Sequence, residues 1–294
     1  MADSASNTDT SESDAADLKL ARAAHRTLEP LHIVAYFAPE PGERYAALGI
    51  KGGMRGYFAS RSAALGRVPA EVVVSTFYNF APSLVAQAIP SVWEVTTPEA
   101  VQEARYAGID AAYRRMLGDD VVESDAMAEA AALAREATTV LRIEGRPLYA
   151  AHASLPWPDD AHLQLFHAQT LLREHRGDGH IAALVLAGLD PLDALLTYLA
   201  HGQGMNEAMT RATRGWSDPE WEAAVVRARK RGLIDDEGAF TPAGAAQRES
   251  IEWQTDGAAA APYRHLGSER TERLRELARP WARKVSHDMF GAPA

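Results

Sequence analysis

The sequence of 294 residues contains no cysteine, so structural disulfides and thiolate metal sites are excluded. It also has no long hydrophobic run, since the longest, from Ile181 to Leu189, is far too short to span a bilayer. The first residues lack the basic and then apolar pattern of a secretory leader. We therefore expect a cytoplasmic protein without a membrane partner.

Common cofactor and catalytic motifs are missing as well. The chain has no nucleophile elbow or dinucleotide fingerprint, and the glycine-rich segment 49–56 follows no convincing strand. We therefore predict no cofactor. Strand signals are few and helical patterns dominate, and a hydrophobic content of 47% is enough to bury a large core.

Basic residues are absent from residues 1–17, which hold five acids. The Ser, Thr, Asp and Ala content of this segment predicts a disordered acidic tail. Beyond it we predict two domains. Residues 18–144 form an N-terminal helical domain that could itself be winged-helix-like, and residues 145–294, which begin in a proline-rich loop, form a C-terminal winged-helix domain.

The most informative segment is 217–256, where signals for a helix, a hairpin and a second helix follow in succession. Ser217 and Glu220 have capping-box spacing, and Gly232 ends the first helix. The apolar residues on either side of 235–238 can pair as a hairpin, and Thr241-Pro242 opens the next helix. The predicted fold class is mostly α, with a winged helix-turn-helix and a small β-hairpin wing. A weak internal similarity leaves two tandem winged-helix-like halves open as an alternative.

Four longer segments carry a family resemblance, namely LEPLHIVAYFAPE (28–40), GYFASRSAALG (56–66), LLREHRGDGHIAAL (171–184) and RGLIDDEGAFTPAGAAQRESIEWQTD (231–256). They resemble a family of actinobacterial helix-turn-helix proteins. From Asp178 to the helix predicted over 268–285, the order of elements is similar to the MarR class of winged-helix regulators. The resemblance implies a winged-helix scaffold. The chain departs from the MarR pattern in its length, about twice that of such a regulator, and in the acidic tip of its wing.

The first functional hypothesis is a dimeric, ligand-responsive transcriptional regulator of the MarR type that binds DNA. Its candidate DNA-binding residues are Arg227, Arg229, Lys230 and Arg231, which lie off the apolar stripe of the predicted helix. Bases in the last turns of a helix also complement the helix dipole, so a structural role is an alternative. The acidic residues 235–237 at the wing tip would be repelled by DNA phosphates.

A pocket for a small organic ligand is predicted from aromatic and polar residues. Tyrosines with an arginine and an asparagine suit an organic acid, although aromatics at helical spacing also suit a core. The candidate ligand-binding residues are Tyr36, Tyr57, Arg61, Tyr78, Asn79, Arg173, His175 and Arg176.

A charged turn supplies the candidates for catalysis, His175, Asp178 and His180. In the structural interpretation, Asp178 caps a helix over 179–187 and His175 complements a helix C-terminus. In the functional one, the three act as general acid and base or bind an anion. Their spacing matches no standard metal-ligand pair, so we predict no metal.

The sequence thus leaves two further functions open. The alternative hypothesis is a winged-helix scaffold that no longer binds DNA and instead binds or transforms a small anionic or aromatic molecule. A third interpretation is a protein-interaction role anchored by Trp216, Trp221 or Trp253.

Overall fold

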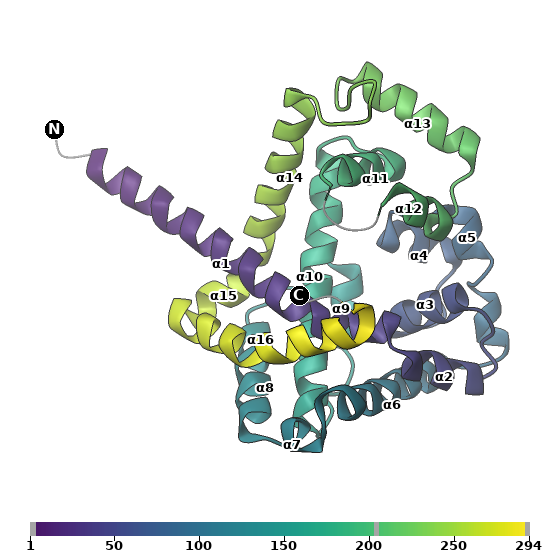
Figure 1. The fold of residues 1–294 in the computed structure, drawn as a ribbon, viewed down its shortest axis with the longest axis vertical. Coiled ribbons are helices and arrows are strands. Elements are labelled where there is room, and N and C mark those ends of the chain that lie inside the picture. The colour runs from purple at the N-terminus through teal and green to yellow at the C-terminus, as the bar shows by residue number, and fades with distance from the viewer. Residues whose placement is uncertain (1–3, 203–205, 292–294) are drawn as a thin grey trace.

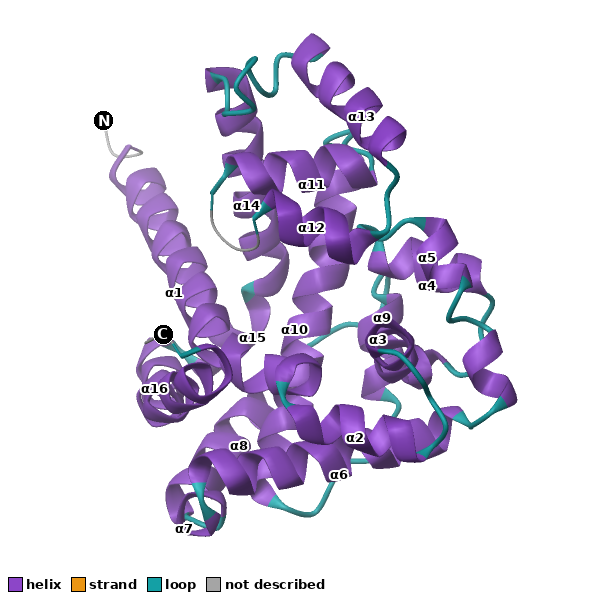
Figure 2. Ribbon diagram, turned by 45° about the vertical axis from the view of Figure 1, so that its right-hand side comes forward, coloured by secondary structure: helices purple, strands orange, loops and turns teal. Residues whose placement is uncertain are grey.

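The computed structural model describes residues 4–202 and 206–291, and every regular element in these two ranges is a helix (Figures 1 and 2). The α-helices are α1 (Ser4–Phe37), α2 (Pro39–Ala47), α3 (Gly53–Ser62), α4 (Ala70–Phe77), α5 (Pro82–Ala86), α6 (Pro98–Leu117), α7 (Asp119–Val122), α8 (Asp125–Thr138), α9 (Pro147–Ala153), α10 (Ala161–Leu186), α11 (Pro191–Ala200), α12 (Glu207–Arg214), α13 (Asp218–Lys230), α14 (Pro242–Ala259), α15 (Ala261–Leu266) and α16 (Ser268–Phe290). Two short 3₁₀ helices, Ala63–Leu65 and Ser91–Glu94, complete the set.

Local sequence signals start several of these helices. At α13 the Ser217 hydroxyl accepts from the Glu220 N–H and the Glu220 carboxylate accepts from the Ser217 N–H, which confirms the predicted capping box. At α14 the Thr241 hydroxyl accepts from the Gly244 N–H at 3.0 Å, and Pro242 occupies the first helical position. These caps satisfy backbone donors that the helix itself leaves unpaired.

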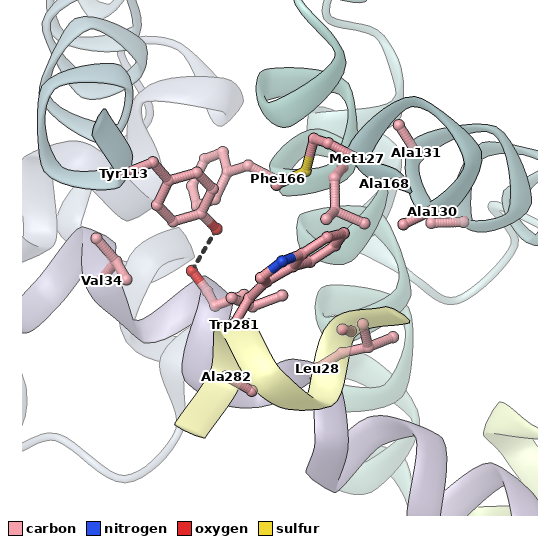
Figure 3. Close-up of a cluster of buried hydrophobic side chains, with 14 of the residues drawn as sticks. Leu28, Val34, Tyr113, Met127, Ala130, Ala131, Phe166, Ala168, Trp281 and Ala282 are labelled. Carbon is pink, nitrogen blue, oxygen red and sulfur yellow. Dashed lines mark hydrogen bonds between the residues drawn. The ribbon is translucent and has the colours of Figure 1, made fainter. Parts of the chain in front are cut away.

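The main hydrophobic core surrounds α10, which runs through the middle of the molecule (Figure 1). Tyr113 of α6, Phe166 of α10 and Trp281 of α16 enter one cluster with Met127 of α8 (Figure 3). The Tyr113 hydroxyl donates to the Leu31 carbonyl of α1 at 2.7 Å, which satisfies the polar end of a fully buried ring. The segments predicted as separate domains, 18–144 and 145–294, therefore share this core.

Two further clusters lie beside it. One is formed by residues of the helices from α2 through α6 and includes Phe58, Val73 and Trp93. The other joins the end of α10 to α11, α13 and α14, with Trp221 at its centre. No described helix is by itself long and apolar enough to cross a membrane; α10 and α11 meet that test only as a pair, and the chain bends by 103° between them.

The predicted β-hairpin wing is wrong. No strand occurs in the described residues, and the segment between α13 and α14 is a turn with one isolated antiparallel bridge, Ile234 to Phe240. The Asp235 side chain accepts from the backbone N–H groups of Glu237 and Ala239, so it takes up donors inside the turn. Pro242 begins α14 directly afterwards and has no N–H with which to extend a ladder. The N-terminal half likewise contains only helices, so a second winged-helix-like half is not seen there.

Helical structure extends into the segment 1–17, for which the composition predicts a disordered tail. Helix α1 begins at Ser4, and residues 1–3 lie outside the described part of the chain. The guanidinium of Arg264 binds Asp14 at 2.8 Å and Asp17 at 2.9 Å. Leu18 is buried in a small cluster with Tyr263. These partners come from the other end of the sequence, so the composition of the segment did not reveal them.

The predicted helix start at Asp178 is wrong as well, because α10 is continuous from Ala161 to Leu186. Asp178 is buried within it, and its carboxylate accepts from the Tyr149 N–H at 2.9 Å, in the first turn of α9. Asp178 therefore caps a neighbouring helix instead of its own. The break before α11 falls at Gly188, where φ is 65°.

Gly244 provides a test of how closely the turn packs on α14. A Cβ at this position would lie 1.9 Å from the Leu233 carbonyl oxygen, so Gly244→Ala must displace the backbone. We expect the free energy of unfolding to fall by about 1–3 kcal/mol in urea denaturation followed by circular dichroism. Gly257→Ala in the same helix is the control, since its Cβ would meet nothing within 4 Å and alanine favours a helix. Equal stability of the two variants would contradict this packing.

Candidate functional site

Helices α11, α12 and α13 lie together at one end of the molecule (Figure 1), and Trp221 of α13 is buried in a cluster with residues of α11. Asn206 caps α12 by accepting from the Met209 N–H, and α12 ends at Gly215 in the left-handed conformation with φ of 75°. After this short turn α13 begins at its capping box. The guanidinium of Arg211 on α12 stacks on the Trp221 ring at 4.5 Å. The arrangement of α12, turn and α13 is a helix-turn-helix.

The four bases predicted to bind DNA have different surroundings. Arg227 lies 2.6 Å from the Asp190 carboxylate, and Arg231 lies 2.6 Å from Asp193, so both fasten α13 to the start of α11. Arg229 donates to the backbone carbonyls of the turn at Asp235 and Asp236. No partner is recorded for the exposed Lys230 among the described residues.

The exposed surface of α13 changes in charge along the helix. Its first turns expose the acids Asp218, Glu220 and Glu222, whereas Arg229 and Lys230 are exposed at its end. Between them Val226 is 64% exposed. A DNA phosphate would therefore be repelled near the beginning of α13 and attracted near its end.

A second site is a polar cavity of about 530 Å³ bounded by α1, α10, α11 and α14. It lies beside the helix-turn-helix, because its wall includes Tyr198 on α11. Its lining residues carry many charges: Arg22, His25, Arg26, Glu29, Arg61, Asn79, Arg173, Glu174, Arg176, Gly177, His180, Tyr198, His201, Arg248, Glu252 and Thr255.

The charges at the base of the cavity form a connected network. Glu174 of α10 is 2% exposed and binds Arg61 of α3 at 3.0 Å and Arg173 at 3.2 Å. The Arg173 guanidinium also binds Glu29 of α1 at 3.1 Å. Burial alone would raise the pKa of Glu174, but the two guanidinium groups outweigh it and lower that pKa to about 2. The carboxylate is therefore charged throughout the physiological pH range.

A second set of ion pairs joins α14 to the other walls. Asp256 binds Arg22 of α1 at 2.5 Å and Arg176 of α10 at 2.8 Å. Along α14, Glu252 binds Arg248 at 2.5 Å. Arg176 and Arg248 each keep one buried nitrogen without a recorded partner, so the network does not use all of its donors.

Of the predicted ligand-binding residues, Arg61, Asn79, Arg173 and Arg176 line this cavity. Tyr36 and Tyr57 lie behind it, where the Arg61 guanidinium sits 6.0 Å and 5.6 Å from their ring centres and bonds the Tyr57 hydroxyl. Tyr78 instead donates its hydroxyl to the Leu189 carbonyl at the break before α11. His175 belongs to a different cavity, which is lined by Arg142, Glu144 and Arg146.

The three predicted catalytic residues do not converge. The His175 ring packs against Tyr149, with ring centres 5.1 Å apart, and Asp178 bonds the Tyr149 backbone. His180 lies on the cavity side of α10, and its Nδ1 is 2.9 Å from the Thr255 hydroxyl. Within residues 4–202 and 206–291, no three His, Asp or Glu side chains form a group that could hold a metal ion.

The tryptophans considered as protein-interaction anchors are also in different environments. Trp221 is 1% exposed, and Trp216 is half-buried and donates its indole N–H to the Asn79 carbonyl at 3.0 Å. Only Trp253 of the three, at 61% exposure, presents its ring to solvent.

Sequence reasoning missed the contributions of α1 and α14 to the cavity. Their polar residues are spaced at helical intervals, as in Arg22, Arg26 and Glu29 or in Arg248, Glu252 and Asp256. That spacing places each set on one helix face, which is a signal that the sequence contains. It does not distinguish a buried charged face from a solvated one, because the difference lies in the packing of the two helices against α10.

Comparison with known protein families assigns nearly the whole chain to one family. A model described as a helix-turn-helix family matches residues 21–291, which include both the α11–α13 unit and the cavity. The chain belongs to this helix-turn-helix family. No match was found among curated proteins or among solved structures.

The histidines of this helix-turn-helix protein predict its response to acid. Burial, with nearby arginines, lowers the pKa of His25 to about 3 and burial lowers that of His180 to about 4, from 6.5. Folding therefore favours the neutral rings, and the stability that they contribute is present above pH 6.5 and lost as the pH falls toward 4. Between pH 6.5 and pH 4 the free energy of unfolding of the wild type should fall. We expect that fall to be about 1–3 kcal/mol smaller in His180→Gln, as measured by urea denaturation at each pH.

The matched control for this experiment is His265→Gln, since His265 is exposed on α15. It should follow the wild-type pH dependence. A His180→Gln variant with the wild-type slope would show that His180 is not buried as a neutral ring.

Proposed function

We propose that this protein is a transcriptional regulator of the MarR type that binds DNA through α13 and responds to a small ligand. The observation that carries the proposal is the α12–turn–α13 unit, in which a capped and partly exposed helix follows a short glycine turn within a helix-turn-helix family. The function rests on this site and on the family, since one fold can serve many functions.

The charges on α13 define how DNA would approach. Arg229 and Lys230 are the bases near the end of the helix that no carboxylate of α11 holds, so they are the better candidates for phosphate contacts. Arg227 and Arg231 serve mainly to position the helix. The acidic first turns favour a docking in which the end of α13, rather than its beginning, lies nearest to the phosphates.

We further propose a homodimer, because helix-turn-helix regulators commonly read two half-sites related by a two-fold axis. A dimer would bring two basic helix ends to the same duplex and would double the number of phosphate contacts. The oligomeric state can be measured by light scattering with and without DNA.

A second function is favoured by two observations together. The first turns of α13 are acidic, and the charged cavity is lined by no residue of α13. In this alternative the scaffold no longer binds DNA and binds a small anionic or aromatic molecule. The three candidates for chemistry do not share one site, so this alternative is a binding function rather than catalysis by His175, Asp178 and His180.

DNA binding by fluorescence anisotropy tests the proposal. The protein is titrated into its own upstream DNA and into an unrelated duplex, at low and near-physiological salt. We expect preferential binding to the upstream fragment that weakens steeply as salt rises. Arg229→Ala with Lys230→Ala should lower affinity by roughly tenfold or more and reduce the salt dependence, because phosphate contacts are lost.

Arg270→Ala supplies the control for charge, since Arg270 is an exposed arginine of α16 that pairs with Glu136 of α8. It should bind DNA as the wild type does. Absence of binding at low salt, with a folded protein, would favour the alternative function. Equal losses in the control and in the double variant would indicate a general charge effect and would count against α13 as the binding element.

A further inference from the structure

We propose that the cavity between α1, α10 and α14 binds a small molecule that carries a phosphate group as a dianion. Six arginines line this cavity, and with Asp256 only four carboxylates oppose them. Two positive charges are therefore left over in a partly enclosed space. A group of charge −2 would balance them.

Two of the three histidines that line the cavity, His25 and His180, do not alter this balance near neutral pH. Burial and the neighbouring arginines keep the pKa of His25 near 3, and burial keeps that of His180 near 4, so both rings are neutral there. A neutral imidazole offers one donor and one acceptor. These rings can thus bond a ligand without adding to the positive charge of the cavity.

The directions of the arginines favour phosphate over carboxylate. They come from four helices, with Arg26 on α1, Arg61 on α3, Arg176 on α10 and Arg248 on α14. A carboxylate presents two oxygens in one plane, whereas a phosphate monoester presents three terminal oxygens in different directions. Donors that surround a space match the second geometry better.

The size of the cavity indicates that the phosphate belongs to a larger molecule. A volume of about 530 Å³ lies within the range of ordinary small-molecule sites and exceeds the need of a bare phosphate. The wall also carries Asn79, Tyr198, His201 and Thr255. These side chains offer hydrogen bonds and one aromatic face to a polar organic group.

A basic groove of about 390 Å³ adjoins the cavity and shares Arg22 and Arg26 with it. It lies between α1 and α16, and its other basic residues are Lys19, Arg275, Arg279 and Arg283. Of these four bases, Arg275 and Arg279 form ion pairs with Glu272. The positive field of the groove would attract an anion toward the cavity entrance.

The cavity lining also includes residues of the two helices that flank the helix-turn-helix along the chain, α11 and α14. Tyr198 belongs to α11, and Arg248, 6.0 Å from the Tyr198 ring centre, belongs to α14, which follows the turn after α13. A phosphate that bonds Arg248 would compete with Glu252 of the same helix, and one that bonds Arg22 or Arg176 would compete with Asp256, whose ion pairs hold α14 against α1 and α10. Coupling of the ligand to DNA affinity rests on the proposed function, but binding of the ligand does not.

Binding is tested by the thermal unfolding of the full chain with inorganic phosphate, phenyl phosphate and succinate, each matched in ionic strength with potassium chloride. We expect both phosphates to raise Tm by about 3 °C at ten times their dissociation constant, and phenyl phosphate to bind more tightly. Succinate should have a smaller effect. The absence of a shift beyond that of potassium chloride, or an equal shift with succinate, would overturn the phosphate assignment.

Two variants locate the site. Arg26→Gln should weaken phosphate binding at least about tenfold without harm to the fold, because Arg26 is exposed and has no ion pair among the described residues. Arg248→Gln should do the same, with the caution that its loss releases Glu252. Arg270→Gln, on the far side of α16 against α8, should bind phosphate normally. Unchanged phosphate binding by Arg26→Gln would overturn the location.

Anisotropy with DNA on the same samples separates this inference from the proposed function. Phosphate binding without DNA binding would support the site and reject the coupling. DNA binding without phosphate binding would reject the site and leave the regulator standing.

Discussion

The ion pairs of Glu174 are the interaction on which the arrangement of the cavity depends. This carboxylate lies in the middle of the central helix and is nearly inaccessible to solvent, so it needs partners that replace water. Arg61 reaches it from α3 and Arg173 from the preceding position of α10, and Arg173 also holds Glu29 of α1. One buried charge thus fixes three helices, two of which come from the first quarter of the chain.

A network of buried ion pairs contributes little net free energy to folding. Removing charges from water costs several kcal/mol per ion, and well-packed apolar side chains of similar size are often as stabilising or more so. The molecule has apolar material for such packing, as the fully buried cluster around Phe166 and Tyr113 shows (Figure 3). The charged interior beside it is consistent with the anion-binding surface that we propose. A surplus of arginines is what distinguishes it from a network that is internally neutral.

The parts of this fold that the sequence predicted correctly are those set by neighbouring residues. The capping box at Ser217, the Thr241-Pro242 start of α14 and the glycine at Gly232 that follows the end of α13 all depend on contacts within a few positions. The wing was predicted from equally local signals, but a hairpin ladder also needs strands long enough to pair. Asp235 takes up donors inside the turn and Pro242 ends the pairing, so the segment closes as a turn.

The candidate site shows the same division. Arg61, Asn79, Arg173 and Arg176 were chosen from sequence as ligand-binding residues and line one cavity, whereas His175 faces another. Continuity of α10 explains the difference. The predicted helix break at Asp178 would have let His175 and His180 turn toward each other, but an unbroken helix separates residues five positions apart by well over a full turn. The partners from α1 and α14 depend on contacts such as that between Arg22 and Asp256, which are 234 positions apart.

The position of α14 connects the charged interior with the helix-turn-helix. Its first turn packs under the Leu233 carbonyl at the end of α13, and its middle carries Arg248, Glu252 and Asp256 into the cavity wall. A helix is stiff over this length, so a change in the ion pairs at its middle is felt at its first turn. An anion can alter the equilibrium position of α14 only if it binds one arrangement of these pairs better than another. Exchange of Asp256 for a ligand oxygen at Arg22 or Arg176 supplies such a difference, because these two pairs join α14 to α1 and α10, whereas the pair of Arg248 with Glu252 lies within α14.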